Sequence, residues 1–364
     1  MGAMPTSRTA ASIPLSALAA VLALTALPRS SAPAQAQAPY TLDANERQRY
    51  GGTFGINFSH YDFDLFDARK QPELARQCAT LPSYQTPECS CTIDWRKVSQ
   101  SGFRFAYLKA SDGSWRDASF PRNWDNLLAE HKGERLYRGA YHFLRPHVSV
   151  REQAETFLRV IGAGSGRKPT QLSPVLDVEW AWQDYEPGAA AEAACPTAAR
   201  DHDRPRCDMW HTKSAHEIAD MASDWIDIVE RALGGQQVAI YTNQSWWNKR
   251  IGSPGLEMAR DQPIWISRYH APDQGPRYEP SWDAQGGSSK WQMPPLPQGA
   301  QYPAKAYTVP HFWQFAEAAR IDAAAYTCRG KSTAKDAELN WLPVTGAAFE
   351  DLFGAPRKAV GSRQ

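Results

Sequence analysis

The sequence predicts an α/β protein, a modified (β/α) TIM-like barrel with three cysteine-bearing loop insertions. Short apolar runs typical of β-strands alternate with amphipathic helical stretches, which is the order of a mostly parallel sheet with helical crossovers. Eight such runs occur, enough to close a barrel. Several are continuously apolar and do not alternate, as expected of strands buried on both faces.

The expected elements follow one another from residue 54 to residue 341. Each strand is a short β-type apolar run, and the run 172–178 has almost no polar residues. In chain order the strands are 54–58, 103–109, 136–143, 172–178, 236–241, 263–267, 311–315 and 337–341. The helices show amphipathic periodicity, and serine begins the last two of them. They are 93–100, 118–131, 149–161 and 214–233.

Three segments interrupt this alternation, at about 62–92, 183–213 and 317–335. Each has weak periodicity, which is typical of a surface excursion. All six cysteines lie in these segments, and Cys195 with Cys207 could close a local disulfide loop. The pairing of the other four, Cys78, Cys89, Cys91 and Cys328, stays open. No C-x-x-C pair is present, so we expect disulfides and no metal site.

Residues 1–38 have the pattern of a secretory signal peptide. Arg8 precedes an apolar run over 13–27, and two A-x-A cleavage sites lie within 34–38. The run is too short to span a membrane, and no later stretch is apolar enough, so the mature chain should have no membrane span. We expect a secreted or periplasmic protein, which agrees with disulfides.

The composition of the chain gives no support to a nucleic-acid partner. The chain has 40 Lys and Arg against 39 Asp and Glu, so it has no net field that would attract a nucleic acid. Hydrophobic residues make up 42% of the 364 residues, enough for a large core. Because the three insertions account for the length beyond a compact barrel, we expect one domain over 39–364, and a monomer.

Two carboxylates end the most apolar strand. Asp177 and Glu179 are two residues apart, so in a strand both side chains point to the same face. Barrel enzymes keep their active sites at this end of their strands. Two close carboxylates in partly apolar surroundings repel, so the pKa of one rises and that group can act as a general acid near neutral pH. Such a pair is the usual apparatus of glycoside hydrolysis. The alternative is a structural acidic strand end that binds an arginine or a cation.

Tryptophan is abundant near the expected strand ends. Such rings could stack on sugars, or they could simply fill the core. The six concerned are Trp180, Trp182, Trp246, Trp247, Trp265 and Trp313.

Several motifs occur in a fixed order. They are 55–60 (GINFSH), 93–95 (IDW) with Val98, 105–113 (FAYLKASDG), 139–143 (GAYHF), 174–179 (PVLDVE), 240–242 (IYT), 263–266 (PIWI) with Arg268 and Tyr269, and 312–315 (FWQF). In these motifs the chain resembles the family 25 glycoside hydrolases, the Chalaropsis-type lysozymes or muramidases. The resemblance runs from about residue 54 to 353, with the three cysteine-bearing segments as insertions.

The resemblance implies a hydrolase that cleaves the β-1,4 bond between N-acetylmuramic acid and N-acetylglucosamine in the glycan strands of peptidoglycan, without a cofactor or metal. It implies Glu179 as general acid, with Asp177 assisting a retaining, substrate-assisted reaction. The substrate-binding residues that it implies are Asn57, Tyr141, Tyr241, Trp265, Arg268, Gln314 and Glu338.

Two positions depart from the family pattern. Asn57 stands where the family's first strand has Asp, and Glu338 begins E-L-N where the family has D-L-N. An amide at 57 removes one repulsive charge near the carboxylate pair. The departures keep a second hypothesis open, a weakened or inactive barrel that binds cell-wall glycan. A third is a muramidase toxin delivered to competitor bacteria.

Overall fold

The computed structural model describes residues 52–60, 92–117, 119–129, 136–164, 170–186, 188, 194–201, 203–259, 262–267, 312–328 and 331–342. The expected signal peptide and the first insertion, except Thr92, lie outside these residues, as do Cys78, Cys89, Cys91 and Arg268. Within the described residues, no helix is long and apolar enough to cross a membrane.

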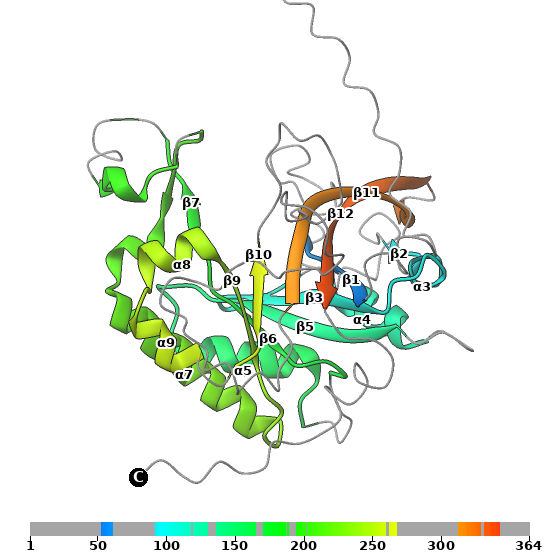
Figure 1. The fold of residues 1–364 in the computed structure, drawn as a ribbon, viewed down its shortest axis with the longest axis horizontal. Coiled ribbons are helices and arrows are strands. Elements are labelled where there is room, and N and C mark those ends of the chain that lie inside the picture. The colour runs from blue at the N-terminus through cyan, green and yellow to red at the C-terminus, as the bar shows by residue number, and fades with distance from the viewer. Residues whose placement is uncertain are drawn as a thin grey trace, which may run out of the picture. The chain divides into compact units, whose positions relative to one another are not determined.

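Eight strands form a closed barrel, as predicted from the sequence. The strand order is β1-β12-β11-β10-β9-β6-β5-β3, and β3 pairs with β1 to close it. The eight are β1 (Thr53–Phe58), β3 (Phe105–Asp112), β5 (Tyr137–Phe143), β6 (Val175–Asp177), β9 (Ala239–Asn243), β10 (Ile264–Ser267), β11 (Phe312–Cys328) and β12 (Lys331–Leu342). All the expected strands are therefore present in order (Figure 1).

The last strand runs against its neighbours. β12 is antiparallel to β1 and to β11, whereas the other barrel pairs are parallel. Its final residue, Leu342, is the backbone partner of Thr53, the first residue of β1. Because β1 points its carboxyl end towards the same edge as the other parallel strands, Thr53 and Leu342 lie together at the opposite edge.

The third expected excursion is wrong as a loop. Residues 317–328 continue β11 and 331–335 begin β12, so 317–335 is largely a β-hairpin that extends beyond the barrel. The short strand β2 (Thr92–Ile93) pairs with its β11 arm. The segment is rich in Ala and charged residues and has few β-formers, but backbone pairing along two arms satisfies its main-chain polar groups despite that composition. Several register shifts mark the bulges this requires.

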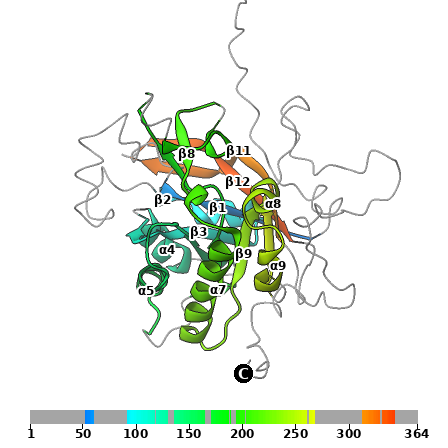
Figure 2. The same cartoon turned by 90° about the vertical axis from the view of Figure 1, so that its left-hand side faces the viewer.

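Helices cover the outside of the barrel. The four expected helices are present as α3 (Trp95–Gln100), α4 (Phe120–Ala129), α5 (Val150–Ile161) and α7 (Ala215–Ala232). Ser149 caps α5, and Ser214 with Glu217 forms a capping box on α7. Two shorter helices, α8 (Gln244–Arg250) and α9 (Pro254–Ala259), were not predicted. α5, α7 and α9 lie side by side (Figure 2).

The apolar residues pack in two main layers. One cluster fills the space between strands and helices, and a second fills the barrel interior with aromatic rings from β3, β5, β9, β10 and β11. Trp246, Trp247 and Trp313 are almost wholly buried, which supports the interpretation that these rings fill the core. Trp265 is equally buried, in the barrel interior. Trp180 and Trp182 are half-buried, with their rings stacked in parallel.

The second insertion forms a small sheet of its own. β7 (Trp182–Asp184) pairs with β8 (Arg206–Asp208), and the expected disulfide between Cys195 and Cys207 is present. The short turns η4 (Thr197–Ala199) and η5 (Met209–Thr212) flank β8. β7 projects past α8 in Figure 1. A second small hairpin pairs β4 (Trp115–Arg116) with the end of β3.

Gly139 on β5 gives a stability prediction. A Cβ atom there would overlap the ring of Tyr107, which is buried and donates its hydroxyl to the carbonyl of Ser173. Gly139→Ala should therefore lower the free energy of unfolding by about 1–3 kcal/mol, a normal cost of overpacking. Urea unfolding measures it. Gly188→Ala, where a Cβ would meet nothing within 4 Å, is the control and should match wild type.

Candidate active site

A cavity opens at the carboxyl ends of the parallel strands. Its volume is about 150 Å³. Pockets that enclose a drug-sized ligand range from roughly 300 to 1,000 Å³, so this one holds only part of a long substrate. Its lining contains Asn57, Ser59, Lys109, Tyr141, Phe143, Val175, Asp177, Glu179, Tyr241, Trp265, Gln314 and Glu338.

The two carboxylates predicted from the strand-end pattern both line the cavity. Asp177 is the last residue of β6 and is only 6% exposed, while Glu179 lies two residues further on and is half-buried. Oδ1 of Asp177 is buried without a hydrogen-bond partner. Burial raises the pKa of Asp177 well above its usual value, and the charges of Glu179 and Glu338 raise it further. The pair therefore keeps a proton at a pH where two separate, exposed carboxyl groups would both be ionised.

A hydrogen-bond network joins β1 and β12 beside this pair. The side-chain amide of Asn57 donates to Glu338, and Oδ1 of Asn57 accepts from Gln314 Nε2 at 3.1 Å and from Asn340 Nδ2 at 2.7 Å. Gln314 also donates to Glu338 at 3.1 Å. Asn57 thus uses both ends of its amide, and each end meets a complementary group.

Two aromatic side chains extend this network. The Tyr241 hydroxyl donates to Gln314 Oε1 at 2.7 Å, and Trp265 Nε1 donates to Asn340 Oδ1 at 3.0 Å. Tyr141 contributes a further wall of the cavity. Eight of the nine residues proposed from the sequence therefore surround one cavity. Arg268 lies outside the described residues.

A buried cation beside the pair was not singled out from the sequence. Lys109 lines the cavity and places Nζ 2.9 Å from Asp112 Oδ2. Arg145 Nη2 lies 2.9 Å from the same oxygen, and both cations lie over the ring of Phe143. Burial alone would raise the pKa of Asp112, but the charges of Lys109 and Arg145 hold it well below its usual value. Asp112 is therefore an anion that fixes Lys109.

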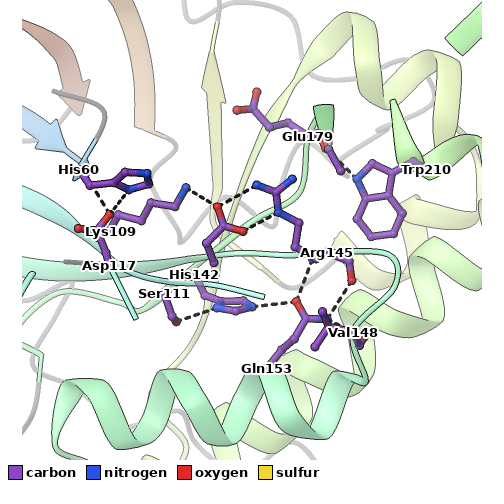
Figure 3. Close-up of polar contacts among 12 residues, drawn as sticks. His60, Lys109, Ser111, Asp117, His142, Arg145, Val148, Gln153, Glu179 and Trp210 are labelled. Carbon is purple, nitrogen blue, oxygen red and sulfur yellow. Dashed lines mark hydrogen bonds and ion pairs between the residues drawn. The ribbon is translucent and has the colours of Figure 1, made fainter. Parts of the chain in front are cut away.

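His60 and His142, the histidines of the sequence motifs, are not among the residues that line the cavity. His142 contacts Ser111 Oγ at 2.8 Å and Gln153 Oε1 at 3.1 Å. Burial lowers its pKa to about 4, so it is neutral at pH 7. His60 is bound to Asp117 (Figure 3). Among the described residues, no three His, Cys, Asp or Glu side chains are grouped as a metal site would need.

Comparison with known proteins decides the family. A family model described as Glycosyl hydrolases family 25 matches residues 88–324, well over half of the chain. The chain belongs to this family. Residues 88–324 include the strand that ends in Asp177, Glu179 two residues beyond it, and Lys109 with Asp112.

Named relatives of the family 25 chain cover parts of it. Lysozyme M1 of Streptomyces globisporus is 30% identical over 179 residues, 49% of this chain and 51% of that protein. The N,O-diacetylmuramidase of Chalaropsis sp. is 24% identical over 226 residues, 58% of this chain and 93% of that protein. The chain thus spans about half the length of lysozyme M1. A solved family 25 glycosyl hydrolase from Bacillus anthracis, 19% identical, covers 87% of this chain and 100% of that one, with a TM-score of 0.49.

The two departures from the family 25 pattern contact each other. Asn57 and Glu338 are the two positions that the sequence indicates as departures, and the amide of the first donates to the carboxylate of the second. An Asp at 57 would place two carboxylates in contact at this point. The amide of Asn57 therefore gives the Glu338 carboxylate a hydrogen-bond donor, a contact that the sequence alone did not reveal.

Asn57→Asp should destabilise the fold by about 1–3 kcal/mol at neutral pH, because Glu338 loses a donor and gains a repelling charge. The repulsion raises the folded-state pKa of one carboxyl group, so stability is retained at low pH and lost as the pH rises. Urea unfolding at pH 4 and pH 7 measures this. Asn57→Asp combined with Glu338→Gln restores a donor and an acceptor, and should recover most of the loss; no recovery would contradict the pairing.

Asp177→Asn should have the opposite effect on stability. Since the folded-state pKa of Asp177 lies above its unfolded value, this carboxyl group favours the fold at low pH and loses that contribution as the pH rises through the folded-state pKa. The neutral amide removes the loss, so the variant should be more stable than wild type at pH 7 and gain nothing near pH 3. Thermal unfolding checks this, with Asp224→Asn on the exposed face of α7 as control.

Proposed function

We propose that this protein is a peptidoglycan hydrolase that cleaves the β-1,4 bond between N-acetylmuramic acid and N-acetylglucosamine. The observation that carries the proposal is the pair Asp177 and Glu179, set together in a cavity at the carboxyl end of the barrel strands. Membership of family 25 and the names of the lysozyme and muramidase relatives support it.

Glu179 acts as the general acid. The pair binds one proton between its two carboxyl groups, and the reactive form has that proton on Glu179 and the charge on Asp177. Lys109 favours this form, because its positive charge lowers the pKa of Asp177 while burial and the neighbouring carboxylates raise it. Glu179 is the more exposed of the two, which suits contact with the glycosidic oxygen.

The reaction proceeds with retention and with help from the substrate. The acetamido oxygen of the sugar attacks the anomeric carbon, the glycosidic bond breaks, and its oxygen takes the proton of Glu179. The Asp177 carboxylate orients the acetamido group through its N–H and stabilises the positive charge that develops. Water then attacks the anomeric carbon and gives a proton to Glu179, while the bond between this carbon and the acetamido oxygen breaks and the acetamido group is restored. Oδ1 of Asp177, buried without a partner, supports this role.

The remaining lining residues bind the glycan. Tyr141, Tyr241 and Trp265 offer aromatic surface and polar edges, and Gln314 and Glu338 offer hydrogen bonds. Arg268 is the further substrate-binding residue proposed from the sequence. Because Asn57 and Asn340 hold Gln314 and Glu338 in place, we assign Asn57 mainly to orienting these groups.

The substrate requires the protein to leave the cytoplasm. The leader over residues 1–38 is proposed to direct export, giving a secreted or periplasmic protein whose mature part is the barrel domain 39–364. The disulfide between Cys195 and Cys207 supports this, because such bonds persist in oxidising compartments.

Glu179→Gln tests the proposal. Loss of a general acid should lower the rate of muropeptide release from purified peptidoglycan by about 10²–10⁴-fold, since an amide cannot supply the proton. Mass spectrometry of the products shows which bond is cut. Glu155→Gln on the exposed face of α5 makes the same chemical change away from the cavity and should keep full activity.

The alternative is a barrel that binds cell-wall glycan without cutting it, motivated by Asn57. Wild-type protein that sediments with cell-wall sacculi but releases no muropeptides would establish that alternative. A Glu179→Gln variant as active as wild type would remove Glu179 from the mechanism.

A further inference from the structure

The backbone that carries the carboxylate pair leaves the barrel just before Glu179. β6 ends at Asp177, whose carbonyl accepts from Leu144 N at 3.0 Å, and Val178 N donates to the carbonyl of Tyr241 at 2.9 Å. Glu179 is the next residue along the chain. Its own main-chain carbonyl accepts a hydrogen bond from the indole Nε1 of Trp210, at 2.8 Å.

Trp210 belongs to the second insertion, not to a barrel strand. It lies in η5 directly after β8, is completely buried, and packs edge-on against Trp246 of α8. In Figure 3 its indole N–H faces the backbone of Glu179, while the Glu179 carboxyl group points away from it. A buried indole N–H usually has an acceptor, and here the bond fixes both the ring and the carbonyl.

The Asp208 side chain contacts the backbone of Trp210. The side chain is 1% exposed and accepts from the backbone N–H of Trp210 at 3.3 Å and of Ala181 at 3.2 Å. It also accepts from Trp246 Nε1 at 3.3 Å and from Arg250 Nε at 2.8 Å, both on α8. One carboxylate therefore ties the start of the insertion to its end and ties both to a barrel helix.

The disulfide closes the same unit. Cys207 precedes Asp208 in β8, pairs with Gln183 of β7, and is bonded to Cys195. Met209 N also donates to the carbonyl of Ala181 at 3.0 Å, next to the Asp208 contacts. The strand that carries Asp208 is thus held by backbone pairing on one side and by a covalent bond on the other.

We propose that the insertion 183–213 positions Glu179 for catalysis, with Trp210 and Asp208 as positioning residues. The proposal rests on the function proposed above for Glu179. Trp210 fixes the Glu179 backbone, Asp208 fixes Trp210, and the disulfide restricts the strand that carries Asp208. A displacement of about 1 Å in a catalytic group can cost on the order of a hundredfold in rate, so an acid placed beyond the end of its strand gains from such a support.

Trp210→Phe is the decisive variant. It keeps a buried ring and deletes the N–H that binds the Glu179 carbonyl. With soluble glycan strands as substrate, kcat should fall about tenfold while KM changes less than about twofold, because Trp210 lines no part of the cavity. Trp247→Phe is the matched control. Trp247 is equally buried on α8, but its indole N–H has no partner, so kcat should stay at the wild-type value.

A second variant guards against a folding defect in the first. Replacing Cys195 and Cys207 together by Ala leaves Trp210 intact and frees the strand that carries Asp208. The kcat of this variant should fall about threefold at unchanged KM, with near-ultraviolet circular dichroism confirming the fold.

The two proposals fail in different ways. An inactive wild-type protein overturns the function proposed for Glu179. If the wild type is active, the positioning role is overturned by either of two results. One is that Trp210→Phe and the cysteine variant both keep the kcat of Trp247→Phe, and the other is that these variants change KM and not kcat.

Discussion

Asn57 and Glu338 are backbone partners where the first and last strands close the barrel, and the side-chain amide of Asn57 donates to the Glu338 carboxylate. Asn57 and Glu338 thus combine a backbone pairing between β1 and β12 with a side-chain contact that places a charge in the cavity. The amide holds Glu338 as an acceptor, and the charge of Glu338 in turn raises the pKa of Asp177. Gln314 and Asn340 converge on the same amide oxygen, so the orientation of the polar wall follows from it.

Two carboxylates, Asp112 and Asp177, lie near the cations at the cavity. Asp112 forms ion pairs with both Lys109 and Arg145, and the aromatic face of Phe143 lies under both cations. The Lys109 charge is thereby fixed in position and still reaches Asp177. The charge of Lys109 lowers the pKa of Asp177, against the larger effect of burial, which raises it. The carboxylate pair therefore retains a proton, and the charge of Lys109 limits how far the pKa of Asp177 rises.

The eight strands along the chain and the carboxylate pair at a strand end could be predicted, because apolar runs and an i, i+2 spacing are local patterns. Strand direction is not local, so the antiparallel course of β12 and the hairpin over 317–335 could not be read. α8 and α9 were missed because they are short and follow each other closely, with Gly252 between them and Pro254 as the first residue of α9. The contacts of Trp210 with Glu179 and of Asp208 with Arg250 join distant residues, and no periodicity encodes them.

The reversed direction of β12 also decides where the barrel can be tethered. Thr53 and Leu342 are paired at the edge of the barrel away from the cavity, because β1 and β12 run in opposite directions. A fusion partner or a surface linker joined at either strand end would start from that edge and leave the mouth of the cavity facing outwards. The barrel is thus suited to immobilisation through either strand end, or through both at once.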